Sequence, residues 1–119
     1  MVKSFREFVE EEDDYMFVMA NYFKSVHPQL PANMYISPKN ANHKARIKVQ
    51  NNKVNKFQLS NMFSIKIHDL SIVGNTGKLD KEDIEYFKRF IIKNREILFK
   101  YWNWEIDSSE LGQKLDFDC

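Results

Sequence analysis

Apolar and cationic residues alternate over residues 44–49, and this alternation constrains the fold more than any other stretch of the chain. The two sets are the apolar Ala45, Ile47 and Val49 and the cationic Lys44, Arg46 and Lys48. Successive side chains of a β-strand point to opposite faces of a sheet, so the pattern predicts a half-buried strand. One face of that strand is expected to pack in the core and the other to carry the positive charges.

Apolar runs on both sides of this strand predict a small antiparallel sheet. Residues 34–36 precede the alternating stretch, and residues 63–68 and 72–73 follow it. The Asn pair at 51–52 favours a tight hairpin turn, because asparagine tolerates positive φ at low cost, and residues 54–59 then form the returning strand. The sequence therefore predicts three or four antiparallel strands in a basic sheet region at 33–73.

Two helical segments flank the predicted sheet. Ser4 and Glu7 have the spacing of a capping box, and apolar residues follow at helical spacing, which predicts an N-terminal helix or helix pair within 1–27. Asp80 is a suitable N-cap for a second, long helix at 80–104, whose apolar residues recur at three- and four-residue steps. Residues 105–119 then form an acidic tail.

The predicted architecture is a single α+β domain over residues 1–119, with both helical segments on one face of the sheet. A chain of 119 residues with 43% hydrophobic residues can bury a core without cross-links. The one cysteine, Cys119, excludes an internal disulfide, and no stretch approaches the roughly 18 apolar residues of a membrane span. We therefore expect a cytoplasmic protein without membrane association.

Positive charge is concentrated in the middle of the chain. Residues 15–68 contain eight Lys or Arg and no Asp or Glu, whereas the segments on both sides are acidic. The formal net charge of +1 conceals this block. Such an asymmetry indicates an anionic partner, and cations that neutralise phosphates gain affinity by releasing counterions.

Alternate cations on one strand face lie roughly 6.6–6.8 Å apart, a spacing that suits a track for phosphates. The candidate binding residues are Lys39, His43, Lys44, Arg46, Lys48, Lys53, Lys56 and Lys66. The expected partner is a nucleic acid, RNA in preference to DNA, or a nucleoprotein complex. The alternative is that these cations only solubilise the sheet or are neutralised by the acidic ends of the chain.

Other side chains allow two further functions. His43 stands among cations and titrates near neutral pH, so it is a candidate acid or base in an RNA-cleaving toxin. Trp102 and Trp104 are candidate anchors of a protein–protein interface, which would make the chain a dimerisation module. The spacing of His27, His43 and His68 does not suit metal ligands, so neither a metal nor another cofactor is expected.

Three short motifs resemble those of one protein family. Residues 40–45, Asn-Ala-Asn-His-Lys-Ala, are similar to an Asn-Pro-Pro-His-x-His motif but lack both prolines and the second histidine, whose place Ala45 takes. Residues 77–79 resemble a Gly-x-Leu entry to a long helix, and residues 95–103 resemble its end near Trp-Asn. These motifs belong to a small uncharacterised bacterial family found in toxin–antitoxin-like cassettes and mobile elements. The resemblance, over about 33–104, implies a bacterial or phage accessory protein.

No complete catalytic motif accompanies the basic block. The glycines at 74 and 77 lack the spacing of a phosphate-binding loop, and no nucleophile elbow or HExxH motif occurs. The sequence therefore predicts a non-catalytic binding protein, which engages a nucleic acid or a nucleoprotein complex through a basic sheet face. An antitoxin-like or anti-defence inhibitor acts in this way.

Overall fold

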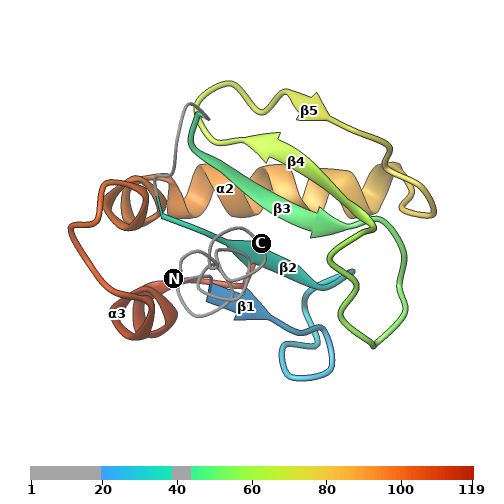
Figure 1. The fold of residues 1–119 in the computed structure, drawn as a ribbon, viewed down its shortest axis with the longest axis horizontal. Helices are drawn as coiled ribbons and strands as arrows, with labels where there is room; N and C mark the ends of the chain where they lie inside the picture. The colour runs from blue at the N-terminus through green and yellow to red at the C-terminus, as the bar shows by residue number, and fades with distance from the viewer. Residues whose placement is uncertain (1–19, 39–43) are drawn as a thin grey trace, which may run out of the picture.

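The computed structural model describes residues 20–38 and 44–119, which form one antiparallel sheet and two helices (Figure 1). The five strands are neighbours in the order in which they follow along the chain. They are β1 (Ala20–Tyr22), β2 (Met34–Ile36), β3 (Arg46–Gln50), β4 (Met62–Lys66) and β5 (Ile72–Val73). The helices are α2 (Lys81–Trp102) and α3 (Ser108–Lys114). The predicted α+β class, antiparallel sheet and long C-terminal helix are confirmed.

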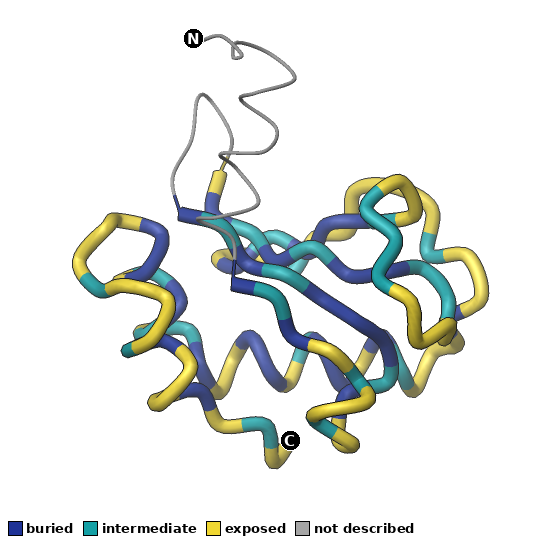
Figure 2. The backbone as a smooth tube through the Cα atoms, turned by 60° about the horizontal axis from the view of Figure 1, so that its bottom comes forward, coloured by how far each residue is buried: buried dark blue, intermediate teal, exposed yellow. Residues whose placement is uncertain are grey.

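Helix α2 lies across one face of the sheet (Figure 1). Alternate residues of β3 and β4 are fully buried, and so are the residues of α2 that recur at helical spacing (Figure 2). The largest of these core residues are Ile47, Phe63, Ile65, Phe87, Phe90 and Ile91. We call the opposite face of the sheet, which carries the intervening residues of each strand, the outer face.

The start of α2 is held by side-chain caps and by one glycine. Asp80 accepts a hydrogen bond from the backbone N–H of Asp83, and the Asp83 carboxylate accepts one from the N–H of Asp80. Gly77 has φ +58°, and a Cβ at this position would lie 2.4 Å from the carbonyl oxygen of Asn51. Only glycine fits there, so the chain can approach the end of β3 closely before it enters the helix.

The predicted N-terminal helix is wrong over the described part of its range. Strand β1 pairs antiparallel with β2, and a turn follows it, so the sheet has five strands instead of three or four. Phe23 and Val26 fall at the helical spacing that predicts a buried stripe within 1–27, but both are exposed. A three-residue strand is too short to show its alternation in the sequence, and pairing with β2 overrides the local spacing. Residues 1–19 lie outside the described residues.

A long loop at 51–61 joins β3 to β4, in place of a tight hairpin and a returning strand at 54–59. Gln50 and Asn33 are fully buried, and their side-chain amides bind this loop. Their partners are the carbonyl oxygens of Val54, Asn55 and Lys56, the N–H of Gln58 and the side chain of Asn52. Gln50 shares its face of β3 with Lys48, so the loop covers one end of the outer face.

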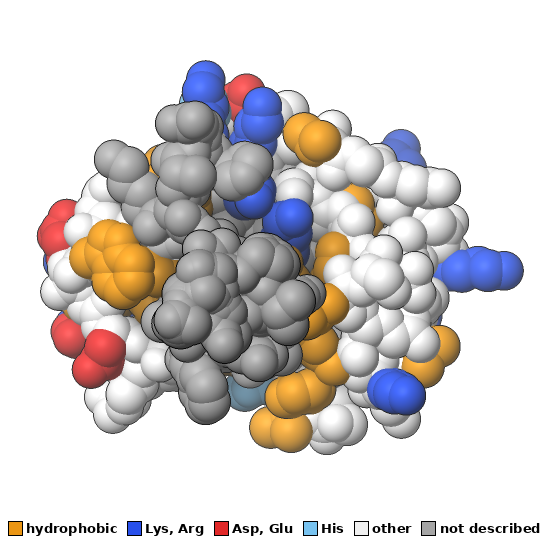
Figure 3. Space-filling view, viewed as in Figure 1, with side chains coloured by type: hydrophobic (Ala, Val, Ile, Leu, Met, Phe, Trp, Pro, Cys, Tyr) orange, Lys and Arg blue, Asp and Glu red, His pale blue; other side chains and the backbone are white. Residues whose placement is uncertain are grey.

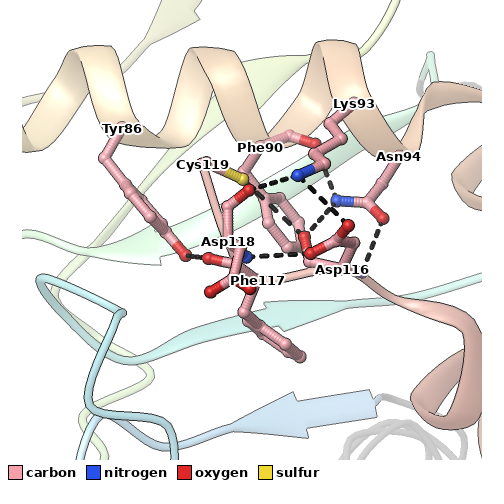
Figure 4. Close-up of polar contacts among 8 residues, drawn as sticks. All are labelled: Tyr86, Phe90, Lys93, Asn94, Asp116, Phe117, Asp118 and Cys119. Atoms are coloured by element: carbon pink, nitrogen blue, oxygen red, sulfur yellow. Dashed lines mark hydrogen bonds and ion pairs between the residues drawn. The ribbon is translucent and has the colours of Figure 1, made fainter.

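The C-terminal residues form α3 and an extended segment that packs along α2 (Figure 4). The side chain of Asn94, which is 4% exposed, donates to the carbonyl oxygen of Asp116 at 2.9 Å and accepts from its N–H at 2.8 Å. The Tyr86 hydroxyl donates to the carbonyl oxygen of Phe117 at 2.8 Å. The predicted acidic tail is therefore a docked segment with defined contacts.

Within residues 20–38 and 44–119, neither helix has both the length and the apolar character that crossing a bilayer requires.

Candidate nucleic-acid interface

The register of the sheet brings three cations together on the outer face. Arg46 of β3 lies directly opposite Lys66 of β4, and Lys48 follows Arg46 by two positions on β3. All three side chains are partly exposed, whereas Ile47 and Ile65, which point toward α2, are fully buried. We call Arg46, Lys48 and Lys66 the cationic cluster. Its strand positions follow from the alternation that the sequence shows.

Arg46 and Lys66 form a cross-strand pair whose Cα atoms lie close together. The N–H of Ile67 donates to the carbonyl oxygen of Ala45 at 3.0 Å, so these two residues occupy a hydrogen-bonded pair. The next pair, Arg46 and Lys66, is therefore a non-hydrogen-bonded pair, in which the Cα atoms are only about 4.5 Å apart. Like charges directly opposite each other destabilise a sheet. A bound anion would relieve this repulsion.

Lys48 lies in an environment that disfavours its charged form. Burial lowers the pKa of the Lys48 ammonium, and the charge of Arg46 lowers it further. Of the ion pairs among the described residues, none includes a member of the cationic cluster. Figure 3 shows Lys and Arg side chains gathered in the upper centre of the view, where Figure 1 places β3 and β4. The Asp69 carboxylate lies near one member of the cluster, because its pKa is lowered first by the hydrogen bond from the Ser71 N–H and in part by the charge of Lys66.

Aromatic rings lie beside the cationic cluster. Tyr35 of β2 is directly opposite Lys48 in the register, so both belong to the outer face. The ring of Phe57, from the loop at 51–61, has its centroid 6.1 Å from that of Tyr35. The ring of Phe23 lies 5.4 Å from that of Phe57 in an edge-to-face arrangement. We call Tyr35, Phe57 and Phe23 the aromatic shelf.

Sequence reasoning missed the aromatic shelf. The sequence predicts a helix around Phe23 and a strand around Phe57, and neither prediction places these rings near the cations. Tyr35 could have been found, because it alternates with Met34 and Ile36, which are fully buried on the α2 side. A strand residue between two core residues points to the outer face.

Lys53 does not join the cationic cluster. Its Nζ atom lies 3.0 Å from Oδ2 of Asp83, at the first turn of α2. The hydrogen bond to the Asp83 carboxylate, together with its charge, raises the pKa of Lys53. Because loop 51–61 replaces the predicted returning strand, Lys53 serves the contact between that loop and the helix start.

The other predicted binding residues have various places. Lys44 is exposed and directly precedes Ala45 and β3, so it extends the cationic cluster at one end. Lys56 is exposed in the loop at 51–61. Lys39 and His43 lie outside the described residues, and with them the predicted acid or base of an RNA-cleaving toxin.

The two described histidines, His27 and His68, contact other side chains of the protein. The ring of His27 stacks on that of Phe117, with centroids 4.3 Å apart and planes at 16°. His68 is exposed, and its Nε2 atom lies 3.6 Å from Oδ2 of Asp69. In the part of the chain that the structure describes, no group of three or more His, Cys, Asp or Glu side chains could hold a metal ion.

The two tryptophans have different surroundings. Trp102 is 8% exposed and packs in the core below the sheet, whereas Trp104 is 61% exposed. Trp104 has φ +63°, an uncommon value for a residue with a side chain, and borders a pocket of about 460 Å³. Three acidic residues, Glu105, Asp107 and Glu110, also line this pocket. Trp104 alone therefore has the exposure of an interface anchor.

The motifs at 77–79 and 95–103 have defined places in this fold. Gly77 makes the close approach to β3, and Leu79 is buried before the helix begins. Arg95 donates from Nε to the carbonyl oxygen of Ile67 at 3.1 Å, and Leu98 is fully buried. Comparisons of the chain with protein-family models, with curated proteins and with solved structures found no match.

Proposed function

We propose that this protein binds a nucleic acid, alone or within a nucleoprotein complex, through the cationic cluster on the outer face. The observation that carries the proposal is the direct cross-strand pairing of Arg46 with Lys66, with Lys48 two positions along β3. Three cationic residues therefore occupy neighbouring positions on one face of a sheet, a rigid element that holds the spacing of their backbones. A chain of phosphates carries repeated negative charges and complements such a cluster.

A purely solubilising role explains this arrangement less well. Solubilising lysines on a sheet are usually interspersed with carboxylates, because like charges in direct register are unfavourable. Here none of the ion pairs within residues 20–38 and 44–119 includes a member of the cluster, and the one carboxylate whose lowered pKa reflects a cluster charge is Asp69, where the hydrogen bond from Ser71 contributes most and Lys66 less. Lys53, in contrast, is paired with Asp83 and shows how an ordinary surface lysine is accommodated in this protein.

The resemblance to a family found in toxin–antitoxin-like cassettes supports a biological setting for this binding. We propose that the protein is non-catalytic and acts as an antitoxin-like or anti-defence inhibitor that occupies the nucleic acid of its target complex. In that setting, expression of the protein should not arrest bacterial growth. Growth arrest that His43→Ala abolishes would instead identify an RNA-cleaving toxin.

The test is binding of fluorescently labelled RNA strands and DNA duplexes at several salt concentrations. Neutralisation of three phosphates gives a slope of log K against log salt of about −2 for a single strand and about −3 for a duplex. Affinity for the single strand should then fall roughly 20-fold between about 50 and 200 mM salt. The triple substitution Arg46→Glu, Lys48→Glu and Lys66→Glu should remove this binding.

A second triple variant controls for the change in total charge. Lys81→Glu, Lys88→Glu and Lys100→Glu alter the same number of charges on α2, on the other side of the sheet from the cationic cluster. This variant should retain most of the binding. Equal losses in the two variants, or binding that salt does not weaken, would refute the proposed interface.

A further inference from the structure

We propose that the ligand is a single-stranded nucleic acid, whose bases stack on the aromatic shelf while its phosphates contact the cationic cluster. This inference rests on the proposed function and names the class of nucleic acid. Proteins that bind single strands combine a cationic track for the backbone with aromatic side chains that stack on the bases. Both parts lie side by side on the outer face of this sheet.

The junction between the two parts is fixed by strand register. The carbonyl oxygen of Asn33 accepts a hydrogen bond from the N–H of Gln50 at 2.8 Å, so these two residues form a hydrogen-bonded pair. Hydrogen-bonded pairs recur every two residues, so Tyr35 and Lys48, two positions along each strand, form one as well. The Cα atoms of such a pair are about 5.5 Å apart. A cation and an aromatic ring are thus neighbours on adjacent strands, at the boundary of the cationic cluster and the aromatic shelf.

The shelf continues from this boundary away from the cations. Phe57 lies next to Tyr35, and Phe23 lies next to Phe57, at the centroid separations given above. Phe23 is 36% exposed and Phe57 is partly exposed. A nucleic-acid backbone that follows β3 past Arg46 and Lys48 therefore has aromatic rings on one flank, where its bases can be placed.

The aromatic shelf is organised before any ligand binds. Phe57 belongs to the loop at 51–61, whose backbone is fixed by hydrogen bonds to the buried amides of Gln50 and Asn33. A ring held in this way loses little conformational freedom on binding, so more of the stacking free energy contributes to affinity. The buried amides of Gln50 and Asn33 thus fix the loop that carries Phe57.

A duplex cannot use this surface in the same way. Its bases are paired and stacked inside the helix, so it can offer phosphates to the cationic cluster but no free base faces to the aromatic rings. The structure therefore predicts a preference for single strands that arises from the aromatic shelf and not from charge. The same apolar rings could instead contact a protein, and the experiment separates that outcome.

The experiment compares three probes on the wild-type protein across the salt series. They are a mixed-sequence RNA strand of about 12 nucleotides, a strand of equal length with abasic sites, and the corresponding duplex. Loss of stacking costs about fivefold to 150-fold in affinity for each base. The intact strand should bind at least about fivefold more tightly than the abasic strand. The salt slope should be the same for both, because both carry the same phosphates.

Substitutions on the shelf provide the complementary measurement. Phe57→Ala should weaken binding of the intact strand about fivefold to 150-fold and leave both the salt slope and abasic-strand binding unchanged. Phe57→Trp keeps an aromatic ring at this position and should retain tight binding. Phe23→Ala is a second variant, at a position outside the loop. Ile92→Ala removes an exposed apolar side chain, 55% exposed, from α2 as the control.

The outcomes distinguish this inference from the proposed function. Salt-dependent binding that is equal for the intact strand, the abasic strand and the duplex would overturn single-strand stacking while leaving the cationic interface intact. Absence of binding to all three probes would overturn both proposals, and the aromatic shelf would then be assigned to a protein partner. The abasic comparison uses only the wild-type protein, so it decides the question even if Phe57→Ala does not fold.

Discussion

Replacement of Asn94 tests whether hydrogen bonds or packing volume hold the C-terminal segment on α2. Asn94 is buried between the helix and the segment, and its amide binds both the N–H and the carbonyl oxygen of Asp116 (Figure 4). It also donates to the carbonyl oxygen of Phe90 at 2.9 Å, one turn earlier in the helix. We consider two variants, Asn94→Ala and Asn94→Leu, of which only the second keeps a similar volume.

The expected loss of stability follows from the number of hydrogen bonds removed. Each bond to Asp116 contributes a net ~0.5–1.5 kcal/mol, so the two together contribute roughly 1–3 kcal/mol. The bond to Phe90 adds little, because that carbonyl belongs to the helix ladder. The loss is limited because the segment can detach and expose its backbone to water. For a domain of this size, 2 kcal/mol corresponds to a decrease in Tm of roughly 6–12 °C.

Urea unfolding followed by circular dichroism measures this loss, and amide hydrogen exchange locates it. Both variants should be destabilised, and the amide of Asp116 should exchange rapidly in both. Lys93→Ala is the control. It removes only exposed contacts to the segment, an ion pair to Asp116 at 3.1 Å and a hydrogen bond to the carbonyl oxygen of Asp118, and should change stability much less. If Asn94→Leu were as stable as the wild type, packing volume and not hydrogen bonding would hold the segment, and this reasoning would fail.

Two further predictions concern the backbone at the start of α2 and the carboxylates. Gly77→Ala should destabilise the protein by about 2–3 kcal/mol in the same urea assay, because it combines positive φ with a contact of 2.4 Å between its Cβ and the Asn51 carbonyl oxygen. Gly112→Ala in α3 should be neutral or slightly stabilising, since its Cβ would meet only the Tyr22 hydroxyl at 3.7 Å, and equal effects of the two changes would contradict the argument. Acid should lower Tm below about pH 4. In the folded protein, hydrogen bonds from backbone N–H groups hold the pKa of several carboxyls below the usual range. The stabilisation that these carboxylates give is present above the unfolded-state pKa and is lost as the pH falls. Scanning calorimetry between about pH 7 and 2.5 measures this, and a constant Tm would contradict it. The carboxyls concerned are those of Asp69, Asp80 and Asp116.

Much of the sheet and the long helix could be predicted because local patterns agree with tertiary packing there. The alternation around Ile47 and the cap at Asp80 are each read from a few neighbouring residues, and the observed β3 and α2 begin within two residues of the expected positions. Strand β1 could not be predicted in this way, because its three residues gain their stability from pairing with β2. The loop at 51–61 also escaped prediction, since it depends on the burial of Gln50.

The same distinction applies to the candidate site. Arg46 and Lys48 share a face by alternation alone, and Lys66 joins them once β4 pairs with β3 in the observed register. Lys53 lies away from them, because residues 51–61 form a loop that pairs Lys53 with Asp83 and not the predicted hairpin with a returning strand. The rings of Phe23 and Phe57 meet through contacts between segments far apart in the sequence, which no local pattern encodes.

The strand order also bears on how the chain reaches its native state. Every strand pairs with the strand that precedes or follows it in the sequence, so the sheet can grow by successive hairpins of strands that are neighbours along the chain. Topologies dominated by such local contacts fold rapidly. The contacts of Phe117 with Tyr22 and His27 are different, because they join opposite ends of the described chain. We expect these contacts to form last, after the sheet and α2 have brought the two ends together.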